Sequence, residues 1–231
     1  MISIILPIYN ECNNPFLSLI IEQFYQDPFF ELIIIDGGST DSTLDNLQRY
    51  AVEIYSLPHS TRAARLNKGI QLAQHPYVLL HHPRSIISEP GINFLKANHT
   101  NYQWAAFQHR FDANKTIFRF ISWYSNQVRV CKKNIVYLDH CMLINRQLLQ
   151  TPAMPDIEIF EDTALSNSLK NKVNAQLLPY DVTTSAIRFI NRGPLRHFCL
   201  NQILKLFYHL NIKPSFMNKL YEKKLNLNQT N

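Results

Sequence analysis

The sequence predicts an α/β fold built on a mostly parallel sheet. Short, wholly apolar runs alternate with helix-length amphipathic stretches from Ile2 to Leu80, which is typical of a right-handed, doubly wound half-domain. Two segments, Ile2–Glu11 and Glu31–Thr43, each begin as a buried strand and stop at polar, turn-prone residues. Ligands bind beyond the carboxyl ends of strands in an open parallel sheet, so these two strand ends predict a pocket.

The elements of the first half follow from their patterns in chain order. Apolar residues at helical spacing predict a helix over Phe16–Tyr25 after the first strand. Residues Ser39–Thr43 are rich in helix N-cap types and lead into a helix over Leu44–Tyr50. The remaining elements expected here are a strand over Val52–Leu57, a helix over Ser60–Gln74 and a strand over Tyr77–Leu80.

The second half has a more mixed pattern. It predicts strands over Tyr102–Arg110, Val136–Ile144 and Ala175–Leu178, and helices around Phe118–Val130 and over Glu161–Lys172. We therefore assign residues 1–187 to one α/β domain and residues 188–231 to a C-terminal helical segment. Within that segment Phe198–Leu210 forms an apolar helix face with basic flanks, which predicts packing either on the domain itself or on a membrane surface.

Charge is unevenly distributed along the 231 residues. The segment from Arg188 to Asn231 carries eight Lys or Arg residues and one acid, whereas the rest of the chain carries 15 basic and 16 acidic residues. A neutral body with a basic tail argues against general nucleic-acid binding and favours a localised anionic partner. No apolar run approaches the roughly 20 residues needed to cross a bilayer.

The four cysteines include no CxxC pair, and the sequence pattern shows no secretory leader. This pattern predicts reduced thiols in a cytoplasmic protein, with peripheral contact to the inner face of the membrane left open by the basic tail. Scattered cysteines also lack the spacing of a zinc site.

Asp36 is the first candidate for ligand binding, because it leaves the second strand directly before Gly37 and Gly38. Its carboxylate could accept hydrogen bonds from a base or ribose where the glycines let the backbone approach a ligand. The alternative is an Asx-turn or a helix cap.

Cationic residues near the same edge are candidates for diphosphate binding. Arg62 and Arg65 share a helix face, and Arg84 follows the strand Tyr77–Leu80. A planar fork of donors suits phosphate oxygens, although a solvated basic face explains the helix pair equally well. The chain has no phosphate-binding P-loop or dinucleotide fingerprint, and the adjacent His81 and His82 point to opposite faces of an extended segment, which argues against a metal there.

Two acidic pairs complete the candidates. Glu161 and Asp162 begin a predicted helix, where they serve either as caps or, through one carboxylate, as a general base. Asp139 and His140 interrupt a predicted strand and either line an acceptor pocket or form a polar turn.

Together these motifs resemble the family 2 glycosyltransferases with a GT-A fold, and the resemblance covers almost the whole chain. The first strand and its end match through Pro7 and Tyr9-Asn10-Glu11, and the second through Asp36 in a Val-Asp-Asp/Gly-Gly-Ser-Thr-Asp pattern. Arg62 to Gly69 resembles the Arg-x-x-x-x-Asn-x-Gly helix of the family, including Asn67. Glu161-Asp162 is similar to the late Glu-Asp pair whose Asp is the base in inverting members. Asp139-His140 and Arg192–Tyr221 resemble a small bacterial subgroup.

One departure concerns the metal. The family carries a metal-binding Asp after the fourth strand, where this chain reads His82-Pro83-Arg84-Ser85. An Arg does not bind Mg²⁺ or Mn²⁺, so Arg84 either replaces the charge of the metal on the leaving diphosphate or marks a protein that binds sugar nucleotides without catalysis.

We adopt the first interpretation, an inverting transferase that moves a sugar from a nucleoside diphosphate donor to an acceptor hydroxyl, with no cofactor and with a divalent metal disfavoured. The acceptor is unidentified; a lipid-linked molecule or a glycan is expected. A nucleotidyltransferase is disfavoured because its glycine-rich N-terminal loop is absent. The expected donor-binding residues are Pro7, Tyr9, Asn10, Glu11, Asp36, Gly37, Arg62, Arg65, Asn67 and Arg84, the catalytic residues Asp162 and Glu161, and the acceptor-binding residues Asp139 and His140.

Overall fold

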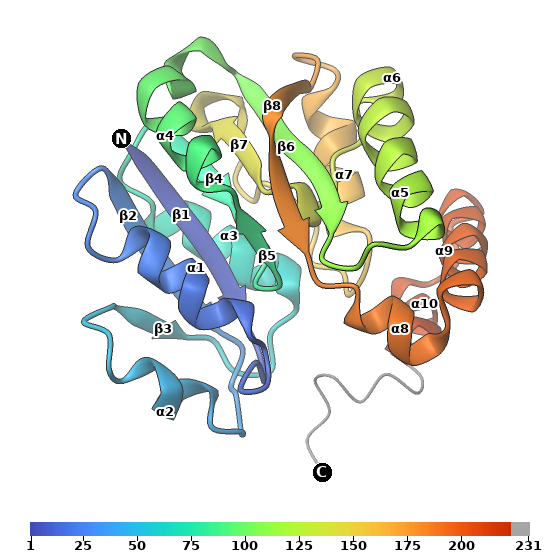
Figure 1. The fold of residues 1–231 in the computed structure, drawn as a ribbon, viewed down its shortest axis with the longest axis horizontal. Coiled ribbons are helices and arrows are strands. Elements are labelled where there is room, and N and C mark those ends of the chain that lie inside the picture. Colours follow the sequence, from blue (N-terminus) through green and yellow to red (C-terminus); the bar gives the residue numbers. More distant parts are fainter. Residues whose placement is uncertain (223–231) are drawn as a thin grey trace.

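The computed structural model describes residues 1–222, and within them the strands form one sheet with helices on both faces (Figure 1). The sheet order is β3-β2-β1-β4-β7-β6-β8-β5. Its strands are β1 (Ile2–Ile8), β2 (Phe30–Asp36), β3 (Ile54–Ser56), β4 (Tyr77–Leu80), β5 (Ser85–Ile87), β6 (Trp104–Phe111), β7 (Met142–Asn145) and β8 (Gln176–Thr184).

The helices cover the sheet in two layers, each with its own part of the core. Leu17 of α1 and Leu95 of α4 pack on one face, and Leu66 of α3 and Leu165 of α7 on the other. The helical elements are α1 (Phe16–Phe24), α2 (Thr43–Leu47), α3 (Arg62–Leu72), α4 (Glu89–Asn98), α5 (Thr116–Trp123), the π-helix η2 (Tyr124–Val130), α6 (Cys131–Lys133), α7 (Glu161–Leu169), α8 (Ile187–Arg192), α9 (Pro194–His209) and α10 (Pro214–Glu222), with short 3₁₀ turns η1 (His99–Asn101), η3 (Leu138–His140) and η4 (Arg146–Leu148).

The expected parallel half is present as β3-β2-β1-β4. All seven residues of β1 are buried, as expected of a central parallel strand covered on both faces. Pro7 has no backbone N–H to donate. It is tolerated there because the pairing of β1 with β4 ends at Ile5 and Leu80, so no residue of β4 pairs with Pro7.

Several elements differ from the expectation in the second half. The predicted strand over Val136–Ile144 is wrong in its first part, where η3 precedes a shorter β7, because Cys141 adopts a left-handed φ of +51° that ends the extended run. Strand β8 continues to Thr184, well past the expected Leu178, and the pattern did not reveal β5 or α4.

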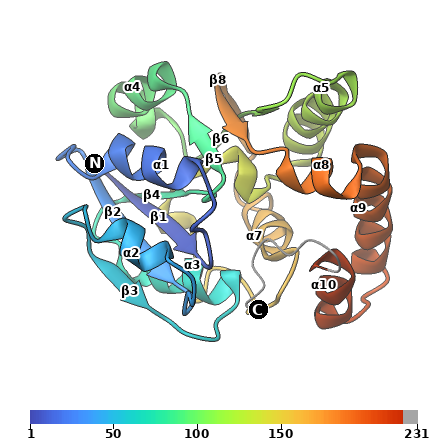
Figure 2. The ribbon, with the colours of Figure 1, turned by 60° about the horizontal axis from the view of Figure 1, so that its bottom comes forward.

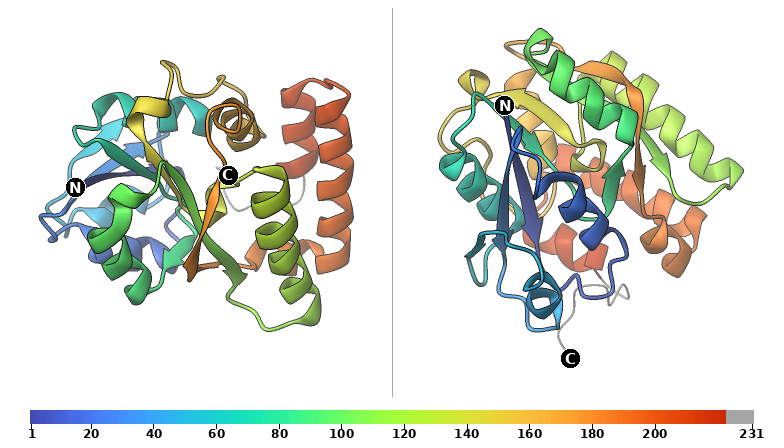
Figure 3. Two further views of the ribbon diagram at one scale, coloured as in Figure 1. Left: turned by 90° about the horizontal axis from the view of Figure 1, so that it is seen from above. Right: turned by 60° about the vertical axis from the view of Figure 1, so that its left-hand side comes forward.

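The C-terminal helices α8, α9 and α10 lie together on the side of the molecule remote from β3 (Figure 2). The expected helix over Phe198–Leu210 falls within α9, and Leu204 of α9 and Met217 of α10 pack on Ile159, just before α7. Helix α9 also runs beside α5 (Figure 3, left). Contact with a membrane stays a prediction; in the described residues no helix is long and apolar enough to cross one.

The contact between α3 and β1 gives a prediction about stability. A Cβ added at Gly69 would lie 2.3 Å from Cγ2 of the buried Ile5. We expect Gly69→Ala to destabilise the protein by about 1–3 kcal/mol through overpacking. Each kcal/mol lowers Tm by roughly 2–4 °C in a chain of this size. The control is Gln71→Ala at an exposed position of the same helix, and equal melting temperatures for the two variants would contradict the prediction.

Candidate functional site

The sheet topology brings the predicted site residues to one edge. Strands β1, β2 and β4 are parallel, so their carboxyl ends meet there. Because β7 is antiparallel to β4, its first residue, Met142, lies opposite Leu80 at the same edge, preceded by Asp139 and His140. Strand β5 likewise begins opposite the end of β8, which places Arg84 there as well.

Hydrogen bonds tie the ends of β1 and β2 together. The backbone N–H of Asn10 donates to Ser39 Oγ at 2.9 Å, and Asn10 Oδ1 accepts from the Thr40 N–H at 2.9 Å. The carboxylate of Asp36 accepts from the N–H groups of Gly38 at 2.9 Å and Ser39 at 3.0 Å. Asp36 therefore forms the Asx-turn that was the alternative to ligand binding, and a contact from it to a nucleoside stays a prediction.

Gly37 makes room for Arg65. A Cβ at Gly37 would meet Nη1 of Arg65 at 1.8 Å, and the Arg65 guanidinium lies 5.7 Å from the centre of the Tyr9 ring. Burial lowers the pKa of Arg65 to about 10, which still leaves the side chain charged at neutral pH. Tyr9, Gly37 and Arg65 thus form one group at the strand edge, and donor binding by them stays a prediction.

Asn67 has a structural task. Its Nδ2 donates to the carbonyl of Met154 at 2.8 Å, and its Oδ1 accepts from the N–H groups of Ala153 at 3.0 Å and Met154 at 3.2 Å. Asn67 therefore holds the loop that leads to α7, and a contact from its second Nδ2–H to the donor stays a prediction.

Arg84 pairs with Glu11, so that the end of β4 is joined to the end of β1. The two side chains are buried and their Nη2 and Oε2 atoms lie 3.0 Å apart. Burial raises the pKa of Glu11, and the charge of Arg84 opposes that rise. Within residues 1–222 no three His, Cys, Asp or Glu side chains are grouped to hold a metal, and a reaction without a metal stays a prediction.

The candidate base, Asp162, lies in the first turn of α7 beside Glu161. Glu161 is fully buried and pairs with Nε of Arg62. Burial and the charge of Glu161 raise the pKa of Asp162 to about 7, against the opposing charge of Arg62. The preceding Phe160 has a left-handed φ of +67° and packs on Tyr208 of α9. A strained backbone braced by a neighbouring helix thus presents the carboxylate.

Asp162 faces a cavity of about 190 Å³ between the sheet edge and the C-terminal helices. The cavity also contains Arg62, Arg84 and Asp139, so that the structure brings these four predicted residues together. Pro7, Tyr9, Asn10, Glu11, Asp36, Gly37, Arg65, Asn67, His140 and Glu161 do not line it.

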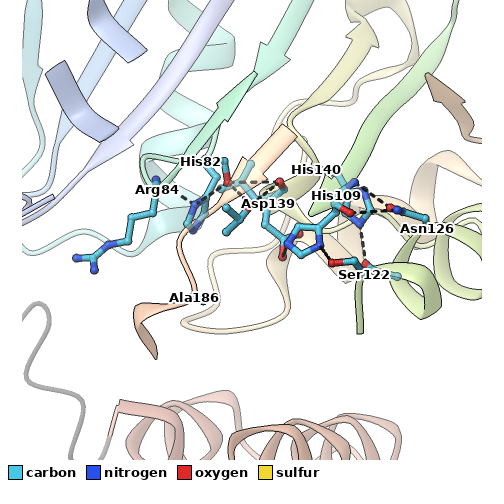
Figure 4. Close-up of polar contacts among 12 residues, drawn as sticks. His82, Arg84, His109, Ser122, Asn126, Asp139, His140 and Ala186 are labelled. Atoms are coloured by element: carbon cyan, nitrogen blue, oxygen red, sulfur yellow. Dashed lines mark hydrogen bonds and ion pairs between the residues drawn. The ribbon is translucent and has the colours of Figure 1, made fainter. Parts of the chain in front are cut away.

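Asp139 and His140 have different surroundings (Figure 4). His140 is fully buried: its Nδ1 donates to the Phe107 carbonyl at 2.9 Å and its Nε2 accepts from Ser125 Oγ at 2.7 Å. Burial lowers the pKa of His140 to about 4, which keeps the ring neutral. Asp139 is partly exposed to the cavity, with Oδ2 3.6 Å from Nε2 of His109. Asp139 therefore lines the cavity, whereas His140 is buried behind it, and acceptor binding by either stays a prediction.

The cavity also contains the neutral His82 and three cationic residues, Arg188, Arg129 and Lys205, that the sequence did not identify as site residues. Arg188 of α8 donates from Nη1 to Tyr221 Oη at 3.1 Å, while its buried Nε has no hydrogen-bond partner among the described residues. His82 is neutral, since burial and the nearby Arg62 hold its pKa well below the usual range. The basic excess after residue 188 was the one signal for Arg188 and Lys205, and it did not locate them.

The chain matches the family described as Glycosyl transferase family 2 over residues 3–151. An uncharacterized glycosyltransferase of Haemophilus influenzae is 35% identical over 112 residues, which cover 43% of this chain and 44% of that protein. The match thus spans less than half the length of this curated relative.

Solved structures of low sequence identity share the fold. Staphylococcus aureus TarS (residues 1–349), in complex with UDP-GlcNAc, is 14% identical with a TM-score of 0.61, covering 98% of this chain and 72% of that one. The mannosyltransferase PcManGT of Pyrobaculum calidifontis, in complex with GDP-Man and Mn²⁺, is 16% identical with a TM-score of 0.64, covering 98% and 70%. The expected mostly parallel sheet with flanking helices and a C-terminal helical segment is thereby confirmed.

Proposed function

Because this chain belongs to glycosyl transferase family 2, we propose that it transfers a sugar from a nucleoside diphosphate donor to an acceptor hydroxyl, with inversion and without a metal. The observation that carries the proposal is the cavity in which Asp162 lies together with the arginines Arg62, Arg84 and Arg188. A carboxylate with a pKa near neutrality suits a general base, and the arginines suit a leaving diphosphate.

The reaction follows from these positions. Asp162 removes the proton of the acceptor hydroxyl while the acceptor oxygen attacks the anomeric carbon. The bond from that carbon to the diphosphate breaks, and its electron pair stays on the diphosphate oxygen. Attack and departure occur on opposite faces of the sugar in one step, which inverts the configuration. Arg62 is oriented for this task by Glu161, whose charge raises the pKa of the guanidinium although burial opposes it.

Arg84 supports a metal-free version of this reaction. A fixed cation at the end of β4 neutralises charge that develops on the diphosphate in the transition state. Glu11 holds the guanidinium in place before the donor binds. The names of the fold relatives support the donor class, since TarS binds UDP-GlcNAc and PcManGT binds GDP-Man.

A nucleotide panel tests the proposal. We expect at least one of UDP, GDP, CDP, ADP and dTDP to bind in calorimetry, with the same Kd in EDTA and in Mn²⁺, and the matching nucleotide sugar to be consumed. Binding that disappears in EDTA would refute metal independence. Binding without any donor turnover, including slow hydrolysis, would identify a sugar-nucleotide binding protein, and absence of all binding would refute the proposed donor class.

A further inference from the structure

Besides the three arginines proposed to bind the diphosphate, the cavity is lined by two more cations, which the transfer step above does not use. Arg129 belongs to η2 and Lys205 to α9, so the two come from elements far apart in the chain. The rings of Tyr124 and Tyr137 line the cavity beside them.

Arg129 is held in a fixed position. Its guanidinium lies 3.9 Å from the centre of the Tyr137 ring, and its Nη1 donates to Ser125 Oγ at 3.0 Å. On the other side of the pair, Nζ of Lys205 lies 5.8 Å from the centre of the Tyr124 ring and 3.3 Å from Gln202 Oε1. Stacking leaves the edge of a guanidinium free to donate in its plane, which is the geometry that planar or tetrahedral anions accept.

The charge of this pair is not balanced within the described residues. No ion pair of residues 1–222 includes Arg129 or Lys205. Burial, together with the charges of Arg129 and Lys133, lowers the pKa of Lys205 to about 7. Arg129 helps to lower the pKa of Asp139, whose Oδ2 also lies 3.6 Å from Nε2 of His109. Both side chains are half-buried, and an anion that joins them would offset the repulsion between the two cations.

The pair is distinct from the group proposed for the donor diphosphate. The charges of Arg62, Arg84 and Arg188 all lower the pKa of His82, which follows β4. The cations that lower the pKa of Lys205 are instead Arg129 of η2 and Lys133 of α6. Asp139 and Asp162 line the same cavity as both groups. If the donor diphosphate occupies the arginines, an anionic group at Arg129 and Lys205 would belong to the acceptor.

We propose that Arg129, Lys205 and the rings of Tyr124 and Tyr137 bind an anionic group, a phosphate or a carboxylate, carried by the acceptor. This assignment rests on the proposed function, since it takes the other cationic group to be occupied by the donor. It makes the acceptor a charged molecule and not a neutral glycan.

Calorimetric titration with inorganic phosphate tests the site directly. We expect Arg129→Gln and Lys205→Gln each to raise the Kd for phosphate by about tenfold or more, as the loss of a charge-assisted hydrogen bond does. Arg129→Lys and Lys205→Arg should keep most of the affinity. The matched control is Lys213→Gln, which removes a charge from an exposed position before α10 and should leave the Kd unchanged.

Arg84→Gln separates the two cationic groups. Phosphate binding that responds to Arg84→Gln but not to the Arg129 and Lys205 variants would overturn the proposal, as would absence of phosphate binding. Near-ultraviolet circular dichroism checks that each variant is folded, and the charge-retaining variants keep the test valid where a Gln variant unfolds.

Two further titrations identify the source of the anionic group. The probes are glycerol 3-phosphate and sedimented phosphatidylcholine vesicles that contain phosphatidic acid. Vesicle binding lost in Lys205→Gln assigns a lipid headgroup, whereas weakened glycerol 3-phosphate binding with unchanged vesicle binding assigns a free phosphorylated acceptor. Both results support the anion site, and no change with either probe overturns it. Nucleotide binding that fails while phosphate binding still depends on Lys205 would refute the donor proposal alone.

Discussion

Asp162→Asn is expected to reduce kcat for sugar transfer by about 10²–10⁴-fold, the contribution typical of a general base. The substitution keeps the size of the side chain and removes its ability to accept a proton. Nucleotide binding should persist, because the arginines proposed to hold the diphosphate are untouched. Initial rates of donor consumption with the donor found in the nucleotide panel measure the change.

The pH dependence of the same residue gives the control. The carboxylate must be ionised to act, and its pKa is raised to about 7, so kcat/KM should rise with pH through about 7 and level off above it. Asp162→Asn should lack this limb. Residual activity within threefold of the unaltered protein, or an unchanged pH profile, would contradict the assigned role.

Stability distinguishes a catalytic from a structural Asp162. A carboxyl whose pKa is higher in the folded than in the unfolded state adds stability that is fully present below the unfolded pKa and is lost as the pH rises through about 7. At pH 8 the ionised, buried carboxylate therefore lowers the free energy of unfolding, and Asp162→Asn should melt at the same or a higher temperature. A large fall in Tm would point to a structural role.

Arg84→Gln is expected to lower the transfer rate by about 10²–10³-fold, because it removes a donor aimed at the developing charge of the diphosphate. Added Mn²⁺ should not restore the rate, since the variant gains no carboxylate at this position. Rates measured in EDTA and in Mn²⁺ give the comparison. A variant as active as the unaltered protein in Mn²⁺ would refute the role of Arg84.

Removing Arg84 also leaves Glu11 buried without its partner, which costs about 3–5 kcal/mol in comparable buried pairs. The double variant Glu11→Gln/Arg84→Gln removes both charges and should recover much of that stability. Its rate should stay low if Arg84 acts on the diphosphate. Recovery of the rate along with the stability would show that Arg84 only supports the fold.

The sequence predicted the parallel half of the sheet well and the second half less well. Wholly apolar runs such as Ile2–Ile8 carry the information for a buried strand in themselves. The turn at Cys141 does not: its left-handed backbone follows from the contacts of its neighbours, among them the buried His140 with its two hydrogen bonds. Asn67 shows the same limit, because its amide serves a loop more than eighty residues further along the chain.

What the sequence determined by itself was local: the alternation of strands and helices, the polar residues at the strand ends, and the Glu161-Asp162 start of α7. Only the tertiary structure decided that Arg84 pairs with Glu11, that Asp36 is used by its own loop, and that Arg129, Arg188 and Lys205 enter one cavity with Asp162. The physical reason is that periodicity reports which face of an element is buried, whereas these contacts join elements distant in the chain. They depend on the antiparallel insertion of β7 and on how α8 to α10 pack against the sheet edge.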